Sequence, residues 1–112
     1  MEIATKTGKG YSTLVIKGRL DALSSPVAEA ACNGAIDGGA LKLVLDLTAL
    51  EYISSAGLRV LLSAAKKMTR LNGKLALCGL RSEVKEVFSI SGLLAVFKVA
   101  ADEAEAGKLV AG

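Results

Sequence analysis

Apolar residues recur along this chain with two different periods, and the order of those periods predicts the fold. Five short β-prone runs lie at Ile3–Lys6, Tyr11–Lys17, Leu41–Asp46, Lys74–Cys78 and Ala95–Val99. Gly8-Lys9-Gly10, between the first two runs, is typical of a hairpin turn. Leu41–Asp46 is the most apolar run and is expected at the centre of a sheet.

Between these runs the apolar spacing changes to three and four residues, which is typical of amphipathic helices. Helices are expected from Pro26 to about Asp37, Ser55 to Leu71, Ser82 to Ser89, and over Asp102–Ala106. At the first of these, Ser25 is expected to cap the helix and Pro26 to take the first helical position. Gly18-Arg19-Leu20-Asp21 is expected to lead out of the sheet toward that helix.

The second helix has the clearest pattern, because its apolar side chains share one face. They are Leu58, Leu61, Leu62, Ala65 and Met68. Two strands followed by alternating helices and strands predict a single α/β domain over residues 1–112. We expect a mixed sheet of four to five strands covered by about four helices.

Composition narrows the class of protein. The 112 residues are 52% hydrophobic, which suffices for one core and one domain. No run reaches the ~18 apolar residues that a membrane span needs, so no membrane insertion is expected. The opening residues lack the basic-then-apolar order of a secretory signal. We therefore expect a soluble, cytoplasmic protein.

Histidine is absent, and this argues against most enzyme classes. Without it a serine–histidine–acid triad cannot form, and no side chain has an unperturbed pKa near neutrality. The two cysteines, Cys32 and Cys78, are not in a Cys-x-x-Cys pair and are expected to be buried free thiols. The sequence thus predicts no metal site, no cofactor and no enzymatic activity.

Charge is distributed unevenly along the chain. From Tyr52 to Ser82 there is no acidic residue, and Arg59, Lys66 and Arg70 are spaced to form one helical stripe. This stripe is either an ordinary solvated helix face or a docking face for an acidic partner. Nucleic acid is not expected as a partner, since no aromatic platform or basic tail accompanies the stripe.

The candidate site lies where the most apolar run ends at Asp46 and the second helix begins at Ser54-Ser55. A helix N-terminus has unpaired N–H groups and a partial positive charge, so a phosphate on a serine there is stabilised. Plain helix capping is the structural alternative for these serines. Gly57, in the first turn, indicates either close approach by a partner or close packing on the sheet.

A family resemblance rests on three segments: Gly18–Asp21, Leu43–Leu47 and Tyr52–Leu62. Together they resemble a STAS domain, and more closely the bacterial anti-sigma factor antagonists. The resemblance implies a partner-switching protein whose unphosphorylated form binds an anti-sigma factor that is also a serine kinase. Binding frees the sigma factor, phosphorylation ends the complex, and a serine phosphatase restores the active form.

The resemblance also implies individual roles. Ser55 matches the phosphorylated serine, with Ser54 as the alternative because it replaces the aspartate that the family often has there. Asp21 and Asp46 match acidic positions near that serine, where each either orients the Ser55 hydroxyl or only bonds loop N–H groups. Gly57 supports the phosphorylation site. Contact with the partner is expected at Ser54, Ala56, Leu58 and Arg59.

Two other functions stay open at this point. A STAS subunit that is not phosphorylated, within a transporter or sensory assembly, would share the fold. A small enzyme or ligand-binding protein could use the edge between Asp46 and Ser55, with a deep pocket there.

Overall fold

The computed structural model describes residues 1–111 and begins with the predicted hairpin. Strands β1 (Glu2–Gly8) and β2 (Tyr11–Leu20) pair antiparallel, from Glu2 opposite Lys17 to Gly8 opposite Tyr11. The turn between them contains Lys9 at φ 54° and Gly10 at φ 86°. Left-handed backbone of this kind is common in tight hairpin turns and favours glycine.

Three strands that each follow a helix extend the sheet in parallel. They are β3 (Lys42–Asp46), β5 (Lys74–Cys78) and β6 (Lys98–Ala100), in the order β1-β2-β3-β5-β6. The central position predicted for β3 is confirmed, and the predicted mixed α/β fold class is confirmed with it.

A sixth strand, β4 (Leu50–Ile53), was not predicted. It pairs in parallel with the end of β2, from Gly18 opposite Leu50 to Leu20 opposite Ile53. Residues 18–20 therefore stay in the sheet, and the expectation that they lead out of it is wrong. Strands β3 and β4 lie one after the other along β2, because the chain bends between Asp46 and Leu50 and then rejoins the same neighbour.

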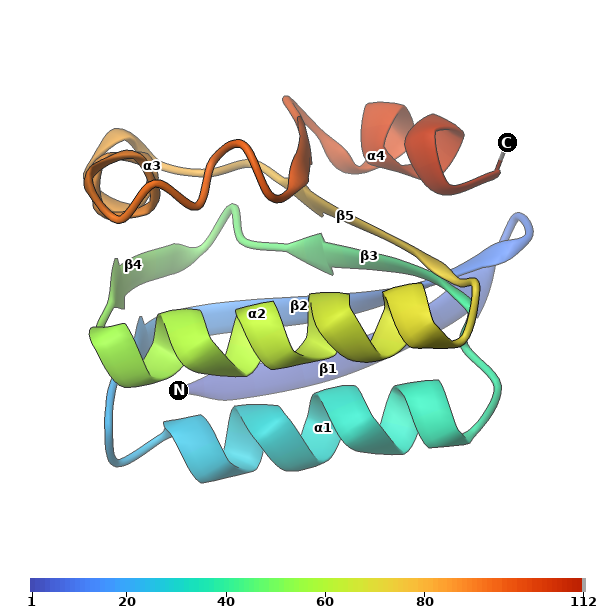
Figure 1. Cartoon of the computed structure of the whole chain (residues 1–112), viewed down its shortest axis with the longest axis horizontal. Coiled ribbons are helices and arrows are strands. Elements are labelled where there is room, and N and C mark those ends of the chain that lie inside the picture. Colours follow the sequence, from blue (N-terminus) through green and yellow to red (C-terminus); the bar gives the residue numbers. More distant parts are fainter. Residues whose placement is uncertain (112) are drawn as a thin grey trace.

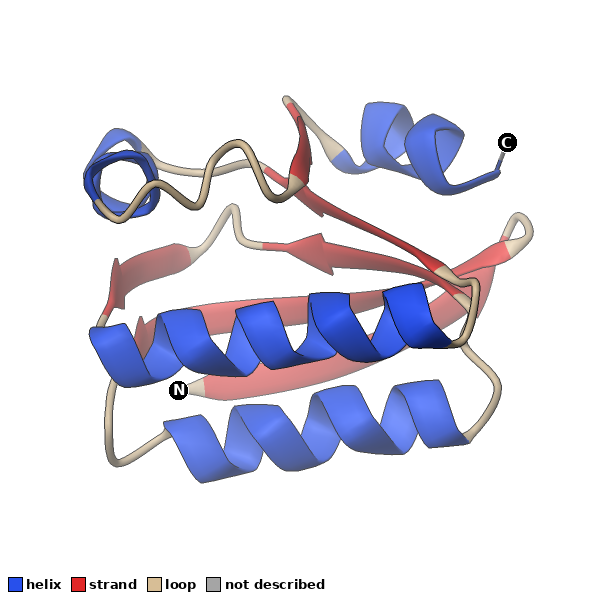
Figure 2. Cartoon of the chain, viewed as in Figure 1, coloured by secondary structure: helices blue, strands red, loops and turns tan. Residues whose placement is uncertain are grey.

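Helices cover both faces of the sheet, as Figures 1 and 2 show. Helices α1 (Ser25–Asp37) and α2 (Ser55–Arg70) lie side by side on one face. Helix α3 (Ser82–Ile90) adds Val84 and Phe88 to the core beneath them, and α4 (Glu103–Ala111) covers the other face. None of these helices, within residues 1–111, has both the length and the apolar character of a membrane span.

Alternation along the strands divides the buried residues between two cores. Leu43 and Leu45 point into the larger core with Leu58, Leu61 and Met68 of α2, whereas Val44 points into a smaller cluster beneath α4. Both cysteines are buried as predicted. Burial raises the pKa of the Cys32 thiol to about 11 and that of Cys78 to about 12, so both stay protonated near neutral pH.

Candidate functional site

The candidate site is the edge of the sheet where β2 and β4 end and where α1 and α2 begin. Both helices start at the same end of the molecule, on the left of Figure 1. The Ser54 N–H donates a 2.9 Å hydrogen bond to the Leu20 carbonyl, which ties the start of α2 to the end of β2. Parallel pairing of β2 with β4 is the reason that both helices begin here.

Ser54 is the N-cap residue of α2, and its hydroxyl has a structural task. Its backbone is extended, at φ −96° and ψ 174°, and its Oγ accepts a 3.2 Å hydrogen bond from the Gly57 N–H. Its carbonyl accepts the Leu58 N–H at 2.9 Å. The capping interpretation therefore describes Ser54, which satisfies one of the N–H groups that a helix start leaves unpaired.

Ser55 is the first residue of α2, and its environment differs from that of Ser54. Its side chain is exposed, and within residues 1–111 its hydroxyl has no hydrogen-bond partner. The first turn of α2 contains no acidic residue. An accessible hydroxyl thus lies at the positive end of a helix dipole, and no carboxylate in the first turn of that helix offsets it.

Gly57 lets α2 approach the sheet closely. A Cβ atom built at Gly57 would lie 2.8 Å from Leu20 Cγ, and 2.9 Å from both Ile53 Cγ1 and the Leu20 carbonyl oxygen. Separations this short do not occur between real side chains, so a larger residue would push the helix start outward. Of the two explanations given by the sequence, close packing is the one that these distances support.

Asp21 lies at the same edge, but its carboxylate holds the start of α1. Its Oδ1 accepts hydrogen bonds from the Leu23 and Ser24 N–H groups, each at 3.1 Å, and from the Ser24 hydroxyl. The bond from the Ser24 N–H is the main cause that holds the Asp21 pKa below its ordinary value. This is the loop-bonding arrangement that the sequence left open.

The cap of α1 also differs from expectation. Ser24 occupies the N-cap position and Ser25 is the first helical residue, so the expectation that Ser25 caps this helix is wrong. The Ser25 hydroxyl instead donates a 2.6 Å hydrogen bond to the Asp21 carbonyl. No side-chain cap is needed, because the Ser25 N–H donates to the Asp21 carbonyl, the Val27 N–H donates to the Ser24 carbonyl, and Pro26 has no N–H.

Asp46 does not lie beside Ser55, and the expected juxtaposition is wrong. Asp46 is opposite Val15 on β2, whereas Ile53 is opposite Leu20, about 16 Å further along that strand. The Asp46 Oδ1 accepts bonds from the Thr48 N–H at 3.0 Å and the Thr48 hydroxyl at 2.6 Å. It stabilises the bend between β3 and β4.

The residues expected to contact a partner divide by burial. Arg59 is exposed, and Ser54 and Ala56 are half-buried. Leu58 is 5% exposed and belongs to the larger core, so its expected role as a contact residue is wrong. The helical period that places Arg59 outward turns its neighbour Leu58 toward the sheet.

Four further residues of this edge were not predicted as site residues. Leu23 and Val27 are apolar but 91% and 59% exposed, at the start of α1. On β4, the Tyr52 ring lies 4.2 Å beneath the Arg19 guanidinium, a cation–π contact at the surface. Leucine in a short connection is the one signal that could have indicated an exposed apolar position.

Surface hollows give little support to a ligand site at the expected edge. The hollow at the start of α2 is lined by Ala22, Pro26, Ala56 and Arg59 among others, and it includes neither Asp46 nor Ser55. Within residues 1–111, no group of three or more acidic or cysteine side chains could hold a metal ion.

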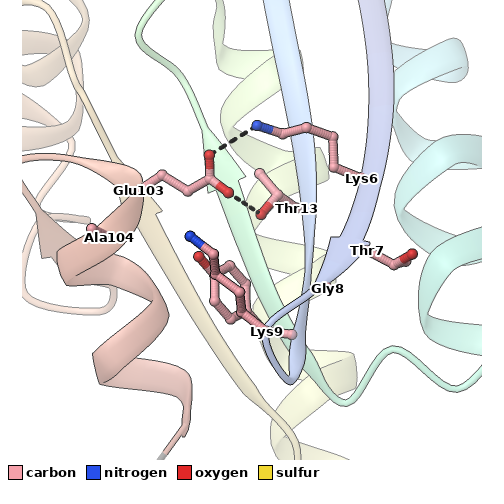
Figure 3. A pocket seen from close by; sticks show the side chains of 8 residues that line it. Lys6, Thr7, Gly8, Lys9, Thr13, Glu103 and Ala104 are labelled. Carbon is pink, nitrogen blue, oxygen red and sulfur yellow. Dashed lines mark hydrogen bonds and ion pairs between the residues drawn. The ribbon is translucent and has the colours of Figure 1, made fainter.

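A second hollow lies between the hairpin and α4 (Figure 3). Glu103 spans it, accepting a 2.9 Å ion-paired hydrogen bond from Lys6 and a 3.0 Å bond from the buried Thr13 hydroxyl. The hydrogen bond from Lys6 is the main reason that the Glu103 pKa is lowered. These bonds hold α4 on the sheet, on the opposite face from α2.

The sequence profile of the STAS domain matches residues 2–106. BtrV of Bordetella bronchiseptica, named as a candidate anti-sigma factor antagonist, is 45% identical over 91 residues, covering 81% of this chain and 78% of that protein.

Two solved structures share the fold. A candidate anti-sigma factor antagonist from Thermotoga maritima superposes with a TM-score of 0.91 at 22% identity, over 98% of this chain and 95% of that one. The Bacillus cell fate determinant SpoIIAA, in its phosphorylated form, superposes with a TM-score of 0.72 at 19% identity, over 96% of this chain and 98% of that one.

Proposed function

Because the chain belongs to the STAS domain family and to its anti-sigma factor antagonists, we propose that it switches between partners through phosphorylation of Ser55. The unmodified protein binds an anti-sigma factor that is also a serine kinase, and this frees the sigma factor. Phosphorylation releases the antagonist, and a serine phosphatase returns it to the binding form. The chain acts as the substrate of these enzymes and has no catalytic role.

One observation carries this proposal: the Ser55 hydroxyl is exposed and unpaired at a helix start that lacks an acidic side chain. Phosphorylation adds about −1.5 to −2 charges and three acceptor oxygens. The N–H groups of the first turn can donate hydrogen bonds to the phosphate oxygens, and the helix dipole stabilises the added charge, so the domain should keep its fold when modified. SpoIIAA, which shares the fold, has been solved in its phosphorylated form.

For a partner packed over Ser55, the phosphate is electrostatically unfavourable. The partner must either desolvate the new charge or face it with a like charge. At about 6 Å and an effective dielectric near 20, one like-charge pair costs about 3 kcal/mol. Since about 1.4 kcal/mol is tenfold in affinity, a single such contact weakens binding roughly a hundredfold without any change in fold.

Ser54 supports the switch without being modified. Its hydroxyl accepts the Gly57 N–H, and the same residue is tied through its backbone to Leu20. A phosphate on Ser54 would have to give up this cap. The geometry therefore favours Ser55 over its neighbour, even though Ser54 replaces the aspartate that resemblance led us to expect.

Asp21 stabilises the site but takes no part in phosphate transfer. It fixes the connection from β2 to α1, which borders the start of α2, and the kinase supplies the groups that transfer the phosphate. Asp46 lies further from Ser55 and stabilises the bend before β4.

The test is phosphorylation of the purified chain by its anti-sigma factor kinase with ATP, with the modified residue located by mass spectrometry. Ser55→Ala should abolish incorporation, and Ser54→Ala should retain it. Ser82 provides an internal control, because it is another exposed serine at the first position of a helix. Phosphate on Ser54 or Ser82 in the wild-type protein would contradict the proposal.

A further inference from the structure

The outer face of α2 presents a row of exposed polar residues that starts at Ser55. Its members are Ser55, Arg59, Ser63, Lys66 and Arg70. Successive members are separated by three or four residues, so they lie in one stripe along the helix. We name the three cations of this row, Arg59, Lys66 and Arg70, the cationic ridge.

No member of the cationic ridge forms a salt bridge within residues 1–111, although Glu29 of α1 borders the same groove between α1 and α2. None of its members has an acidic partner within 4.0 Å, and α2 itself contains no acidic residue. Lys67, which follows Lys66 in the sequence, does have an acidic partner: its ammonium pairs with Asp37 of α1 at 2.7 Å. Three positive charges, equal to the formal net charge of +3 for the whole chain, are thus concentrated on one exposed face.

Resting on the proposed function, we propose that the cationic ridge docks an acidic surface of the same kinase that modifies Ser55. Arg59 lies one helical turn from Ser55, so a partner that covers the serine also reaches the ridge. From Arg59 to Arg70 the ridge extends about 16 Å along a helix whose opposite side is fixed in the core. A row of carboxylates on the partner complements it.

A charged surface of this kind mainly affects the rate of association and the orientation of the bound partner. Exposed ion pairs contribute little each, but a row of like charges steers an oppositely charged partner and sets its register. Salt screens these interactions over a Debye length of about 8–10 Å. The proposal therefore predicts a complex whose affinity falls with ionic strength, and a ridge variant in which this dependence is reduced.

The experiment measures binding of the unphosphorylated chain to the kinase in the absence of ATP. The ridge variant is K66E/R70E, which leaves Ser55 and Arg59 intact. The matched control is K108E, an exposed lysine in the last turn of α4, on the opposite face of the sheet. A neutral variant, K66Q/R70Q, serves if the charge-reversed protein fails to fold.

At low salt K66E/R70E should bind about tenfold more weakly than wild type, with most of the loss in the association rate, and K108E should stay within about twofold. In roughly 0.5 M salt the difference between ridge variant and wild type should shrink to about threefold or less. Equal losses in K66E/R70E and K108E, or a loss that salt does not change, would overturn the proposal.

Other occupants of the ridge give different results. If the ridge variant loses affinity for duplex DNA or for anionic vesicles while its affinity for the kinase is unchanged, the docking proposal is wrong. The two proposals also fail separately. Binding that depends on the ridge while Ser55 stays unmodified with ATP contradicts the phosphorylation switch alone. Absence of any binding by the wild-type chain overturns both.

Discussion

The starts of α1 and α2 lie at the same edge of the sheet, and each contains two serines in succession. At α1 both hydroxyls are engaged: the Ser24 oxygen accepts the Asp21 N–H at 2.9 Å, and Ser25 donates to the Asp21 carbonyl. At α2 only Ser54 is engaged, through Gly57, and Ser55 is free within residues 1–111.

The two helix starts also differ in charge. The α1 start has an anion already in place, because the Asp21 carboxylate accepts the N–H groups of Leu23 and Ser24. The first turn of α2 has no carboxylate, and the next charge along it is the cation Arg59. Two serines in succession at a helix start therefore do not by themselves define a phosphorylation site. The free hydroxyl and the missing anion distinguish one start from the other.

Supplying the missing anion at α2 should produce the largest effect. Ser55→Asp places a charge at the start of α2, and we expect roughly a hundredfold loss of affinity for the anti-sigma factor, about 3 kcal/mol. Binding can be measured by calorimetry. Ser82→Asp adds the same charge at the first residue of α3 and should leave binding within about twofold. Equal affinity for Ser55→Asp and wild type would refute the switch.

Displacing the start of α2 should have the next largest effect. Gly57→Ala puts a Cβ against Leu20 and Ile53, so we expect a loss of about 1–3 kcal/mol in the free energy of unfolding. Gly34→Ala in α1 is the matched control, because a Cβ there meets nothing within 4 Å. It should stabilise the protein by up to about 1 kcal/mol. Denaturant unfolding distinguishes the two, and equal stability would contradict the packing described for Gly57.

Removing the cap of α2 tests whether its two serines have different roles, one in stability and one in phosphorylation. Ser54→Ala loses the bond to the Gly57 N–H and should cost about 1 kcal/mol of stability, while phosphorylation at Ser55 continues. Ser55→Ala should leave the unfolding free energy nearly unchanged and stop phosphorylation. The reverse assignment of these two effects would show that the roles of the serines are exchanged.

Titrating the anion of α1 should have the smallest effect. The Asp21 pKa is held below its ordinary value of 3.8, so its contribution to stability is present above that pH. It is lost as the pH falls from there toward the folded-state pKa. The stability advantage of wild type over Asp21→Asn should be constant from pH 7 to 5 and shrink below about pH 4. Thermal unfolding across this range provides the measurement, and an advantage that persists at pH 2 would count against the Asp21 bonds.

Local patterns predicted the helices of this site well. The start of α2 at Ser55, the apolar face through Leu58 and Met68, and the end of α1 at Asp37 all follow from spacing and breaker residues near in sequence. These features depend on contacts within one or two helical turns, which a sequence displays directly.

Features that depend on the path of the chain could not be predicted in the same way. β4 is four residues long and directly precedes a helix, so its pattern is too short to recognise. Missing it led to the wrong position for Asp46, because only the pairing of β4 with β2 reveals the distance from Asp46 to Ser55. The Lys6–Glu103 pair joins residues 97 positions apart, a separation that no local motif indicates.

The exposed side chains of Leu23 and Val27 at the start of α1 have an evolutionary consequence. Neither belongs to a buried core, so substitutions at these positions carry little folding penalty and selection can change them independently of the domain. After a gene duplication, two copies can diverge here while they inherit the same scaffold.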